Sequence, residues 1–283
     1  MNRTYLVALI IIIILVIIIL VNIAYQNQQN LIFLPDKLPQ DHKFYFDILQ
    51  NNFQEHWIQV DERTKIHGVL FQEITDEGIP PICNNPNQQK GLVLYLHGNT
   101  GNVAMWGNIA PVFTYQGYDI FILDYRGYGK SEGKITSQDQ LFNDVQIVYD
   151  YFKKLYREED IVLSGYSIGT GIAAHLASKN HPRMLILNAP YYSLTRLIQE
   201  TYSFIPNLMI AFKLETYKYI QELDCPVYLF HSVDDDLIPV QHSKDLAKLF
   251  NRPEDELFIL GGVGHSHINQ SKRYQRILGE LLN

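Results

Sequence analysis

The hydrophobic pattern begins with a long run of apolar residues at the N-terminus. The run is unbroken from Leu6 to Val21, and Ile23–Tyr25 nearly prolongs it. A helix of about 20 apolar residues can cross a bilayer, whereas a core helix of a soluble domain shows a polar face. A cleaved signal peptide usually has a shorter apolar region of about 7–15 residues and a small-x-small site after it. We therefore expect residues 1–25 to form a retained membrane anchor.

The charges on either side of this anchor predict its orientation. Arg3 and the terminal amine precede the apolar run, and Lys37 is the first positive charge after it. Positive charges close to a span favour the cytoplasmic side. We therefore expect a single-pass membrane protein with a cytoplasmic N-terminus, a juxtamembrane segment over residues 26–54 and an extracytoplasmic body.

Beyond residue 54 the pattern changes to short apolar runs. Glu55–Val60 and Lys65–Gln72 are expected to pair as a hairpin, and Thr75–Lys90 reads as an exposed polar loop. Predicted strands and helices then alternate. The strands are Leu92–Leu96, Asp119–Leu123, the run that begins at Ile161, Met184–Leu187, Val227–Phe230 and Leu257–Leu260, and the helices are Val103–Tyr115, Gln138–Leu155, the stretch after Ser167, Gln241–Phe250 and Gln270–Leu281. This alternation predicts a mainly parallel α/β sheet of about eight strands with helices on both faces.

The sequence Gly165-Tyr166-Ser167-Ile168-Gly169 lies between one of these strands and its helix. Glycine has no Cβ, so the chain can turn tightly and the helix can pack close to the strand. A serine at such a turn is exposed at the sheet edge, beside the free N–H groups of a helix N-terminus, and becomes a nucleophile when a base adjoins it. The pentapeptide alone occurs by chance, but its strand–turn–helix context predicts that Ser167 is a nucleophile.

A serine nucleophile requires a base and an acid that orients the base. His265 follows the last predicted strand in a glycine-rich loop, which suits an imidazole held over the sheet edge, and His267 is the alternative base. The acid is expected in the loop after the strand Val227–Phe230. Three adjacent carboxylates are candidates there: Asp234, Asp235 and Asp236.

The reaction also requires donors for an oxyanion. The turn His97-Gly98-Asn99 follows a predicted strand, and the N–H groups of Asn99 and Ile168 are the predicted donors. We expect His97 to brace this loop rather than serve as a second base. Asp124 ends another strand and is expected to make a structural hydrogen bond to a nearby loop.

One stretch, residues 191–223, interrupts the alternation of strands and helices. It is rich in aliphatic and aromatic residues. A pair of core helices would have the same composition. However, an insertion at this point of the chain lies over the carboxyl edge of the sheet, where α/β proteins bind ligands. We therefore expect a small helical lid whose apolar face covers a pocket beside Ser167.

Composition excludes several other classes of function. The 283 residues are 47% hydrophobic, which suits one large domain or two small ones, and the net charge of −7 argues against a nucleic-acid partner. The two cysteines, Cys83 and Cys225, form no metal-ligand spacing, and we expect Cys225 to be a buried core residue. We expect no metal and no organic cofactor.

Several of these stretches together resemble the α/β-hydrolase superfamily. They are Leu96–Asn102, Asp124–Gly133, the turn around Ser167, the aspartates that precede Pro239, and Gly264-His265. The chain looks most similar to membrane-anchored serine hydrolases whose relatives include monoacylglycerol lipases, lysophospholipases and acyl-protein thioesterases. In such proteins the acid lies four residues before the proline, which assigns it to Asp235. Ser232 stands where a glycine is usual, and Ser266-His267 stands where a small polar pair is usual.

The resemblance implies an α/β-hydrolase domain over residues 55–283, with the lid at 191–223. It implies hydrolysis of carboxylic esters or thioesters of lipid-like acyl groups by Ser167, His265 and Asp235, through an acyl-enzyme. Two alternatives remain: a catalytically inactive hydrolase-fold binding module tethered to a membrane, and a serine peptidase of the same fold. Acyl length, leaving group and oligomeric state are left open.

Overall fold

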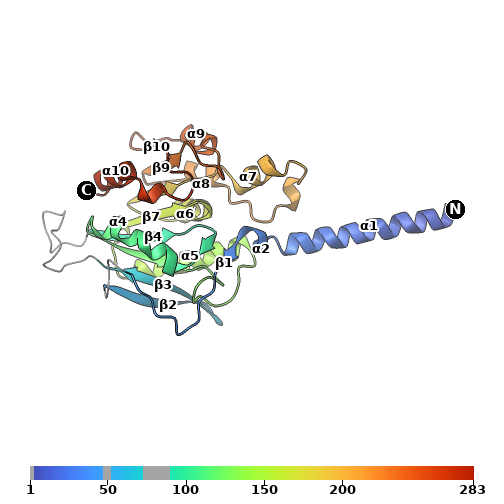
Figure 1. Ribbon diagram of the computed structural model, residues 1–283, viewed down its shortest axis with the longest axis horizontal. Coiled ribbons are helices and arrows are strands. Elements are labelled where there is room, and N and C mark those ends of the chain that lie inside the picture. Colours follow the sequence, from blue (N-terminus) through green and yellow to red (C-terminus); the bar gives the residue numbers. More distant parts are fainter. Residues whose placement is uncertain (1–2, 47–51, 73–89) are drawn as a thin grey trace.

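The computed structural model describes residues 3–46, 52–72 and 90–283. Its centre is an eight-stranded sheet with the order β10-β9-β8-β7-β4-β6-β3-β2 (Figure 1). The strands from β10 to β6 in that order are parallel, and β3 and β2 continue the sheet antiparallel. The bounds are β2 Phe53–Asp61, β3 Thr64–Phe71, β4 Gly91–Leu96, β6 Tyr118–Leu123, β7 Ile161–Tyr166, β8 Met184–Asn188, β9 Val227–Ser232 and β10 Glu256–Leu260. The predicted α/β architecture is therefore confirmed.

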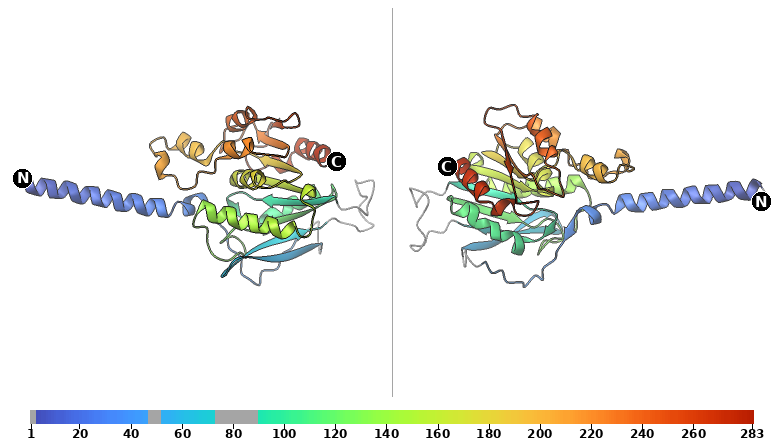
Figure 2. Two further views of the ribbon diagram at one scale, coloured as in Figure 1. Left: turned by 180° about the vertical axis from the view of Figure 1, so that it is seen from behind. Right: turned by 45° about the horizontal axis from the view of Figure 1, so that its top comes forward.

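Both faces of the sheet are buried, which explains why its strands are continuous apolar runs. In β4, Leu92, Leu94 and Leu96 pack into one hydrophobic cluster with α5 and α6, while Val93 and Tyr95 pack into a second cluster on the other face with α4 and α10. Figures 1 and 2 show these helices as layers on the two faces of the sheet. The remaining bounds are α5 Gln138–Phe152, η2 Glu158–Asp160, α6 Ile168–Ser178, α9 Gln241–Ala247, η4 Ile268–Gln270 and α10 Lys272–Leu282.

The prediction of one continuous helix over Val103–Tyr115 is wrong. The structure has α3 Val103–Trp106, a 3-10 turn η1 Gly107–Ile109 and α4 Ala110–Thr114 instead. Pro111 lies in the first turn of α4, where its missing N–H costs nothing, whereas inside a longer helix it would remove a hydrogen bond. Of the loop expected at Thr75–Lys90, residues 75–89 lie outside the described residues, and Cys83 is among them. Cys225 is buried, as expected.

The N-terminal helix α1, Arg3–Gln26, projects away from the body (Figure 1). Within its stretch Tyr5–Gln26, an 18-residue window has a mean hydropathy of 3.7 and is not buried in the body. Among the described residues, α1 is the one helix long and apolar enough to cross a membrane. After it come α2, Gln29–Ile32, and the short strand β1, Leu34–Pro35, which pairs in parallel with β5, Thr100–Gly101. The segment that follows α1 is thus joined to the loop that follows β4.

The segment 191–223 contains α7 Leu194–Thr201, a 3-10 turn η3 Asn207–Met209 and α8 Thr216–Gln221. Its two ends belong to the core: Tyr191, Leu214 and Ile220 are buried, and α8 packs on α6. Its middle part stands away from the body near the point where α1 leaves it (Figure 2).

Candidate active site

Ser167 occupies a strained turn between β7 and α6. Its φ of 53° and ψ of −118° lie in a region that residues other than glycine rarely adopt. A Cβ at Gly169 would lie 2.1 Å from the carbonyl oxygen of Leu96, and one at Gly165 would lie 2.6 Å from the carbonyl oxygen of Gly169. Both glycines are therefore needed for the close contact of α6 with the sheet, and that contact holds the serine at the carboxyl edge.

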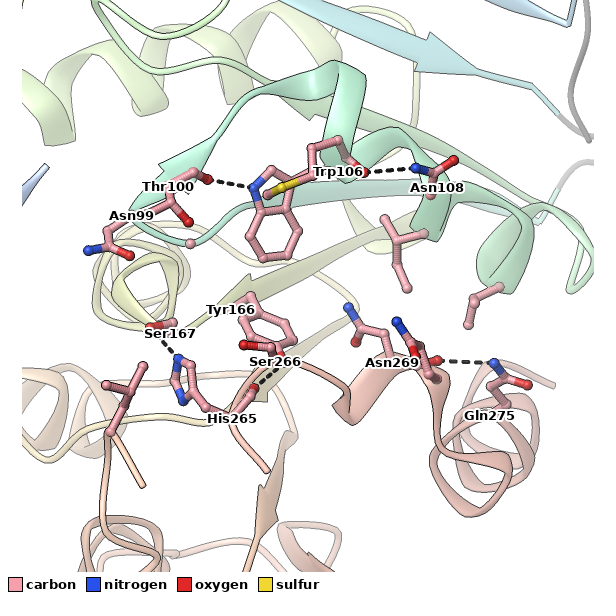
Figure 3. Close-up of a pocket in the computed structure, with 16 residues that line it drawn as sticks. Asn99, Thr100, Trp106, Asn108, Tyr166, Ser167, His265, Ser266, Asn269 and Gln275 are labelled. Carbon is pink, nitrogen blue, oxygen red and sulfur yellow. Dashed lines mark hydrogen bonds between the residues drawn. The ribbon is translucent and has the colours of Figure 1, made fainter. Parts of the chain in front are cut away.

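A chain of two hydrogen bonds links Ser167, His265 and Asp235, although the three residues come from separate loops (Figure 3 shows the first bond). The Nε2 atom of His265 lies 3.0 Å from Oγ of Ser167, and its Nδ1 atom lies 2.7 Å from Oδ2 of Asp235. Donation from Nδ1–H to the carboxylate leaves Nε2 with a free lone pair toward the serine hydroxyl. The sequence-predicted residues are thus brought together, in an arrangement that suits proton transfer from the serine.

Asp235 is selected from the three adjacent aspartates by its position. Its side chain is fully buried, and its Oδ1 accepts the backbone N–H groups of Leu237 and Ile238 at 2.9 and 2.8 Å. Burial would raise the pKa of this carboxyl, but hydrogen bonds from His231, His265 and the Ile238 N–H outweigh burial and hold the pKa well below its usual range. Asp235 is therefore ionised at neutral pH, next to His265.

The other candidates lie elsewhere. The carboxylate of Asp234 accepts the N–H of Gly262, and Asp236 is exposed. His267 is exposed and precedes η4, and it is not among the described residues that line the cavity.

His231 is a partner of the acid that the sequence analysis did not identify. This fully buried imidazole lies with Nε2 3.2 Å from Oδ2 of Asp235 and 2.8 Å from the carbonyl oxygen of Ile238, and with Nδ1 2.6 Å from Oγ of Ser243. It therefore ties the loop that carries Asp235 to β9 and α9. Its place near the end of a strand, four residues before Asp235, is the feature of the sequence that indicates this role.

The loop that contains Asn99 is held by hydrogen bonds to its carbonyl groups. Nδ1 of His97 lies 2.7 Å from the carbonyl oxygen of Gly98, which requires this nitrogen to carry the proton. Burial lowers the pKa of His97 despite the nearby carboxylate of Asp124, so the ring is neutral. Because N–H and C=O point in opposite directions across a trans peptide, fixing the Gly98 carbonyl also fixes the Asn99 N–H.

The carbonyl on the other side of Asn99 is held by two further donors. The hydroxyl of Tyr128 lies 2.7 Å from this oxygen, and the backbone N–H of Leu34 donates to it at 3.0 Å. The hydroxyl of Tyr125 similarly donates to the carbonyl of His97 at 3.0 Å. Burial raises the pKa of both tyrosines, so their hydroxyls remain protonated donors. The segment that follows α1 thus contacts the predicted oxyanion loop directly.

Asp124 has the structural role that its position predicted. Its buried Oδ1 accepts the N–H of Val103 at 2.8 Å, at the start of α3. Ile168, the other predicted oxyanion donor, is the first residue of α6, where the backbone N–H has no partner within the helix.

A cavity of about 640 Å³ adjoins Ser167 (Figure 3). Both apolar and polar side chains line it. Its described lining residues are Gly98, Asn99, Thr100, Met105, Trp106, Asn108, Ile109, Val112, Tyr166, Ser167, Leu237, His265, Ser266, Asn269, Gln270 and Gln275. This volume and lining suit a small organic ligand with an extended apolar part.

The segment 191–223, expected to cover this pocket, contributes none of the described lining residues. The described part of the chain also holds no group of three or more His, Cys, Asp or Glu side chains that could bind a metal ion.

Comparisons with known proteins agree with the fold. A family model described as serine aminopeptidase, S33 matches residues 87–221. A putative alpha/beta hydrolase, L404 of Acanthamoeba polyphaga mimivirus, is 28% identical over 87% of this chain and 89% of its own length. The lysophosphatidylserine lipase ABHD12 of Danio rerio is 25% identical over 68% of this chain and 58% of its own length. The structure of the Pyrococcus furiosus esterase Pf2001 matches with a TM-score of 0.65 and 18% identity, over 88% of this chain and 96% of that protein.

Proposed function

Because the chain belongs to the α/β-hydrolase superfamily, we propose that it is a serine hydrolase that cleaves carboxylic esters or thioesters through an acyl-enzyme. The observation that carries the proposal is the hydrogen-bonded chain from Ser167 through His265 to Asp235. Ser167 and His265 line a cavity large enough for a substrate.

The geometry supports the following sequence of steps. Ser167 Oγ attacks the acyl carbonyl while Nε2 of His265 takes its proton, and Asp235 stabilises the imidazolium that forms. The N–H groups of Asn99 and Ile168 hold the oxyanion of the tetrahedral intermediate, and loss of one such donor typically costs about 3–4 kcal/mol. His265 then protonates the leaving alcohol or thiol. Water attacks the acyl-enzyme by the same route and releases the acid. None of these steps requires a metal or an organic cofactor.

Covalent labelling tests this chemistry directly. A fluorophosphonate probe should label the full-length protein in detergent, and Ser167→Ala should abolish labelling. Ser266→Ala is the matched control. Ser266 lines the same cavity but takes no part in the hydrogen bonds that link Ser167, His265 and Asp235. A folded wild-type protein that never labels would contradict the proposal and would favour the inactive binding module instead.

The substrate is proposed to be a lipid-like acyl ester or thioester. The cavity offers Met105, Trp106, Ile109, Val112 and Leu237 to an acyl chain. The apolar helix α1 keeps the enzyme at a membrane. One relative carries the name lysophosphatidylserine lipase. A panel of acyl esters and thioesters of increasing chain length should show a preference for longer chains, and a uniform preference for the shortest ester would contradict it.

An aminopeptidase is the second candidate, because the matching family model carries that description. An aminopeptidase must bind the free amine of its substrate, which calls for a carboxylate near the nucleophile. No aspartate or glutamate is found among the described residues that line the cavity. Aminoacyl amides in the same panel separate the two candidates: we expect no measurable cleavage of them.

The anchor is proposed to be retained, with the hydrolase domain on the extracytoplasmic side. Arg3 before the span and the absence of a positive charge after it until Lys37 support this orientation. Protease treatment of sealed cells should digest the domain, and full protection until the membrane is opened would reverse the assignment.

A further inference from the structure

Four exposed apolar side chains lie near the base of α1 and form what we call the apolar ridge. Tyr202, Phe204 and Leu208, between α7 and α8, expose 51%, 81% and 90% of their surface, and Leu31 of α2 exposes 79%. Single exposed apolar residues are common on protein surfaces, but a group of large ones marks an interaction site. The identity of the partner follows from where the ridge lies.

The two parts of the ridge are joined by contacts. Gln28, two residues after the end of α1, donates from its amide to the carbonyl of Met209 and accepts the N–H of Ala211 at 2.9 Å. Nearby, the rings of Phe33 and Phe212 meet edge to face, with centroids 5.4 Å apart. In every view of Figures 1 and 2 the segment after α7 extends to the level at which α1 leaves the body, on the same side of the molecule.

Neither part of the ridge carries a charge. Residues 201–212 contain no Asp, Glu, Lys or Arg, and residues 26–35 contain none either. A charged surface would resist entry into a lipid interface, whereas Phe, Leu and Tyr are favoured there. A bilayer crossed by α1 would therefore meet an uncharged apolar surface directly beside the helix.

We propose that the apolar ridge inserts into the interfacial layer of the same bilayer that α1 crosses, which gives the protein a second membrane contact. This inference rests on the proposed membrane anchor. Together the two contacts fix the orientation of the body. The loop of Asn99 contacts the chain just after α1, so the orientation holds the carboxyl edge of the sheet, with Ser167, toward the lipid. An acyl substrate then reaches the cavity with little passage through water.

Lipid exposure of single sites tests the proposal in the full-length protein, reconstituted in phosphatidylcholine vesicles. A single cysteine is introduced by Phe204→Cys or Leu208→Cys in a Cys83→Ser background and is labelled with an environment-sensitive fluorophore. The remaining thiol, Cys225, stays unlabelled because burial raises its pKa to about 12. Leu20→Cys within α1 is the lipid reference. Leu155→Cys is the aqueous reference, since Leu155 is 59% exposed beyond the end of α5.

We expect probes at 204 and 208 to be quenched by a lipid-borne quencher and shielded from a water-soluble one, as at 20, with the reverse at 155. If the probes at 204 and 208 behave like the one at 155, while the lipid-borne quencher quenches the probe at 20, insertion of the apolar ridge is contradicted and the membrane anchor is supported. Shielding from both quenchers would indicate a protein partner or a second copy, which also overturns it. A probe at 20 that lipid does not quench would overturn the anchor and the ridge together.

Activity gives an independent readout. The double variant Phe204→Ser/Leu208→Ser should hydrolyse an ester dissolved in water at the wild-type rate but an ester embedded in vesicles severalfold more slowly. Leu155→Ser should match the wild type on both substrates. Equal rates of the double variant and the wild type on the vesicle-borne ester would contradict the proposal. If the wild-type protein does not react with the fluorophosphonate probe, the proposed hydrolase function is contradicted instead.

Discussion

At the scale of single residues, the choice of acid rests on the buried carboxylate of Asp235. Asp235→Asn would place an amide against Nδ1 of His265, and the neutral amide can favour the wrong tautomer and cannot stabilise an imidazolium. We expect kcat to fall by roughly 10³–10⁴-fold, as is typical when such an acid is made neutral. Asp236→Asn changes an exposed neighbour and should leave kcat near the wild-type value. Steady-state hydrolysis of a soluble ester checks both, and an equal loss in the two variants would contradict the assignment.

The hydroxyl of Tyr128 gives a second prediction at this scale. Tyr128→Phe removes a hydrogen bond to the carbonyl of Asn99 but keeps the ring. A net loss of about 0.5–1.5 kcal/mol corresponds to a roughly 2- to 10-fold fall in kcat, with KM little changed, because the loop contributes only when the oxyanion forms. Tyr149→Phe is the matched control, since its hydroxyl contacts Glu158 far from the site. A rise in KM at constant kcat would show that Tyr128 shapes substrate binding instead.

The sequence predicts residues well where their position along a strand determines their position in space. Ser167 and His265 both follow parallel strands, and such strands end at one edge of the sheet, so their proximity could be predicted. Asp235 was one of three equivalent aspartates until the resemblance assigned it. Tyr125 and Tyr128 could not be assigned, because their hydroxyls reach carbonyl groups 28 and 29 residues away. Such contacts depend on the tertiary path of two loops, which leaves no periodic signal.

At the scale of secondary-structure elements, the pairing of β1 with β5 makes the segment that follows α1 part of the site. Leu34→Pro removes the N–H that donates to Asn99, and Phe33 already has the extended backbone, φ −106° and ψ 122°, that a following proline requires. We expect a severalfold lower kcat on a soluble ester. Leu34→Ala keeps the N–H and should retain wild-type kcat. If both variants lose the same activity, the side chain of Leu34 is responsible and the hydrogen bond is not.

The contact between α6 and the sheet leads to a second prediction for elements. Gly169→Ala would place a methyl group 2.1 Å from the carbonyl oxygen of Leu96, so α6 must move and the turn at Ser167 must distort. We expect destabilisation by about 1–3 kcal/mol, together with loss of fluorophosphonate labelling. Gly261→Ala is the control, because a methyl group there meets no atom within 4 Å. Thermal unfolding and probe labelling measure the two effects, and a fully labelled, stable Gly169→Ala protein would contradict them.

Elements differ in how far their sequence predicts them. The parallel strands are apolar on both faces and could be located to within one or two residues. The prediction of one helix over Val103–Tyr115 is wrong because Gly107 and Pro111 interrupt an apolar pattern that otherwise suits a helix. The strands β1 and β5 have two residues each, too few for any alternation of apolar and polar positions. The segment 191–223 had the composition of a lid, but its contacts with Gln28 place its middle part beside α1.

At the scale of the whole molecule, burial of several imidazoles couples stability to pH. Burial is the largest cause that lowers the pKa of His56, His97, His175 and His242, and for His175 it does so to about 4. The unfolded chain binds protons on these groups below about pH 6.5, while the native state does not until a lower pH. The unfolded state therefore holds more protons in this window, and stability must fall as the pH falls from about 6.5 toward 4. Asp235 acts at lower pH, because its depressed pKa contributes stability that is lost below about pH 4.

This coupling can be tested at His175, whose ring stacks on Phe142 with centroids 3.7 Å apart. His175→Phe keeps an aromatic ring in the stack and removes the group that can be protonated. Its melting temperature should therefore fall less than that of the wild type between pH 7 and pH 5 in the same detergent, by a difference equivalent to about 1–2 kcal/mol after allowance for partial exposure. His181→Gln, which changes an exposed imidazole, should keep the wild-type slope. The remaining buried histidines should preserve part of the slope in His175→Phe. A variant with the full wild-type slope would show that the native state accepts a proton at this position without cost.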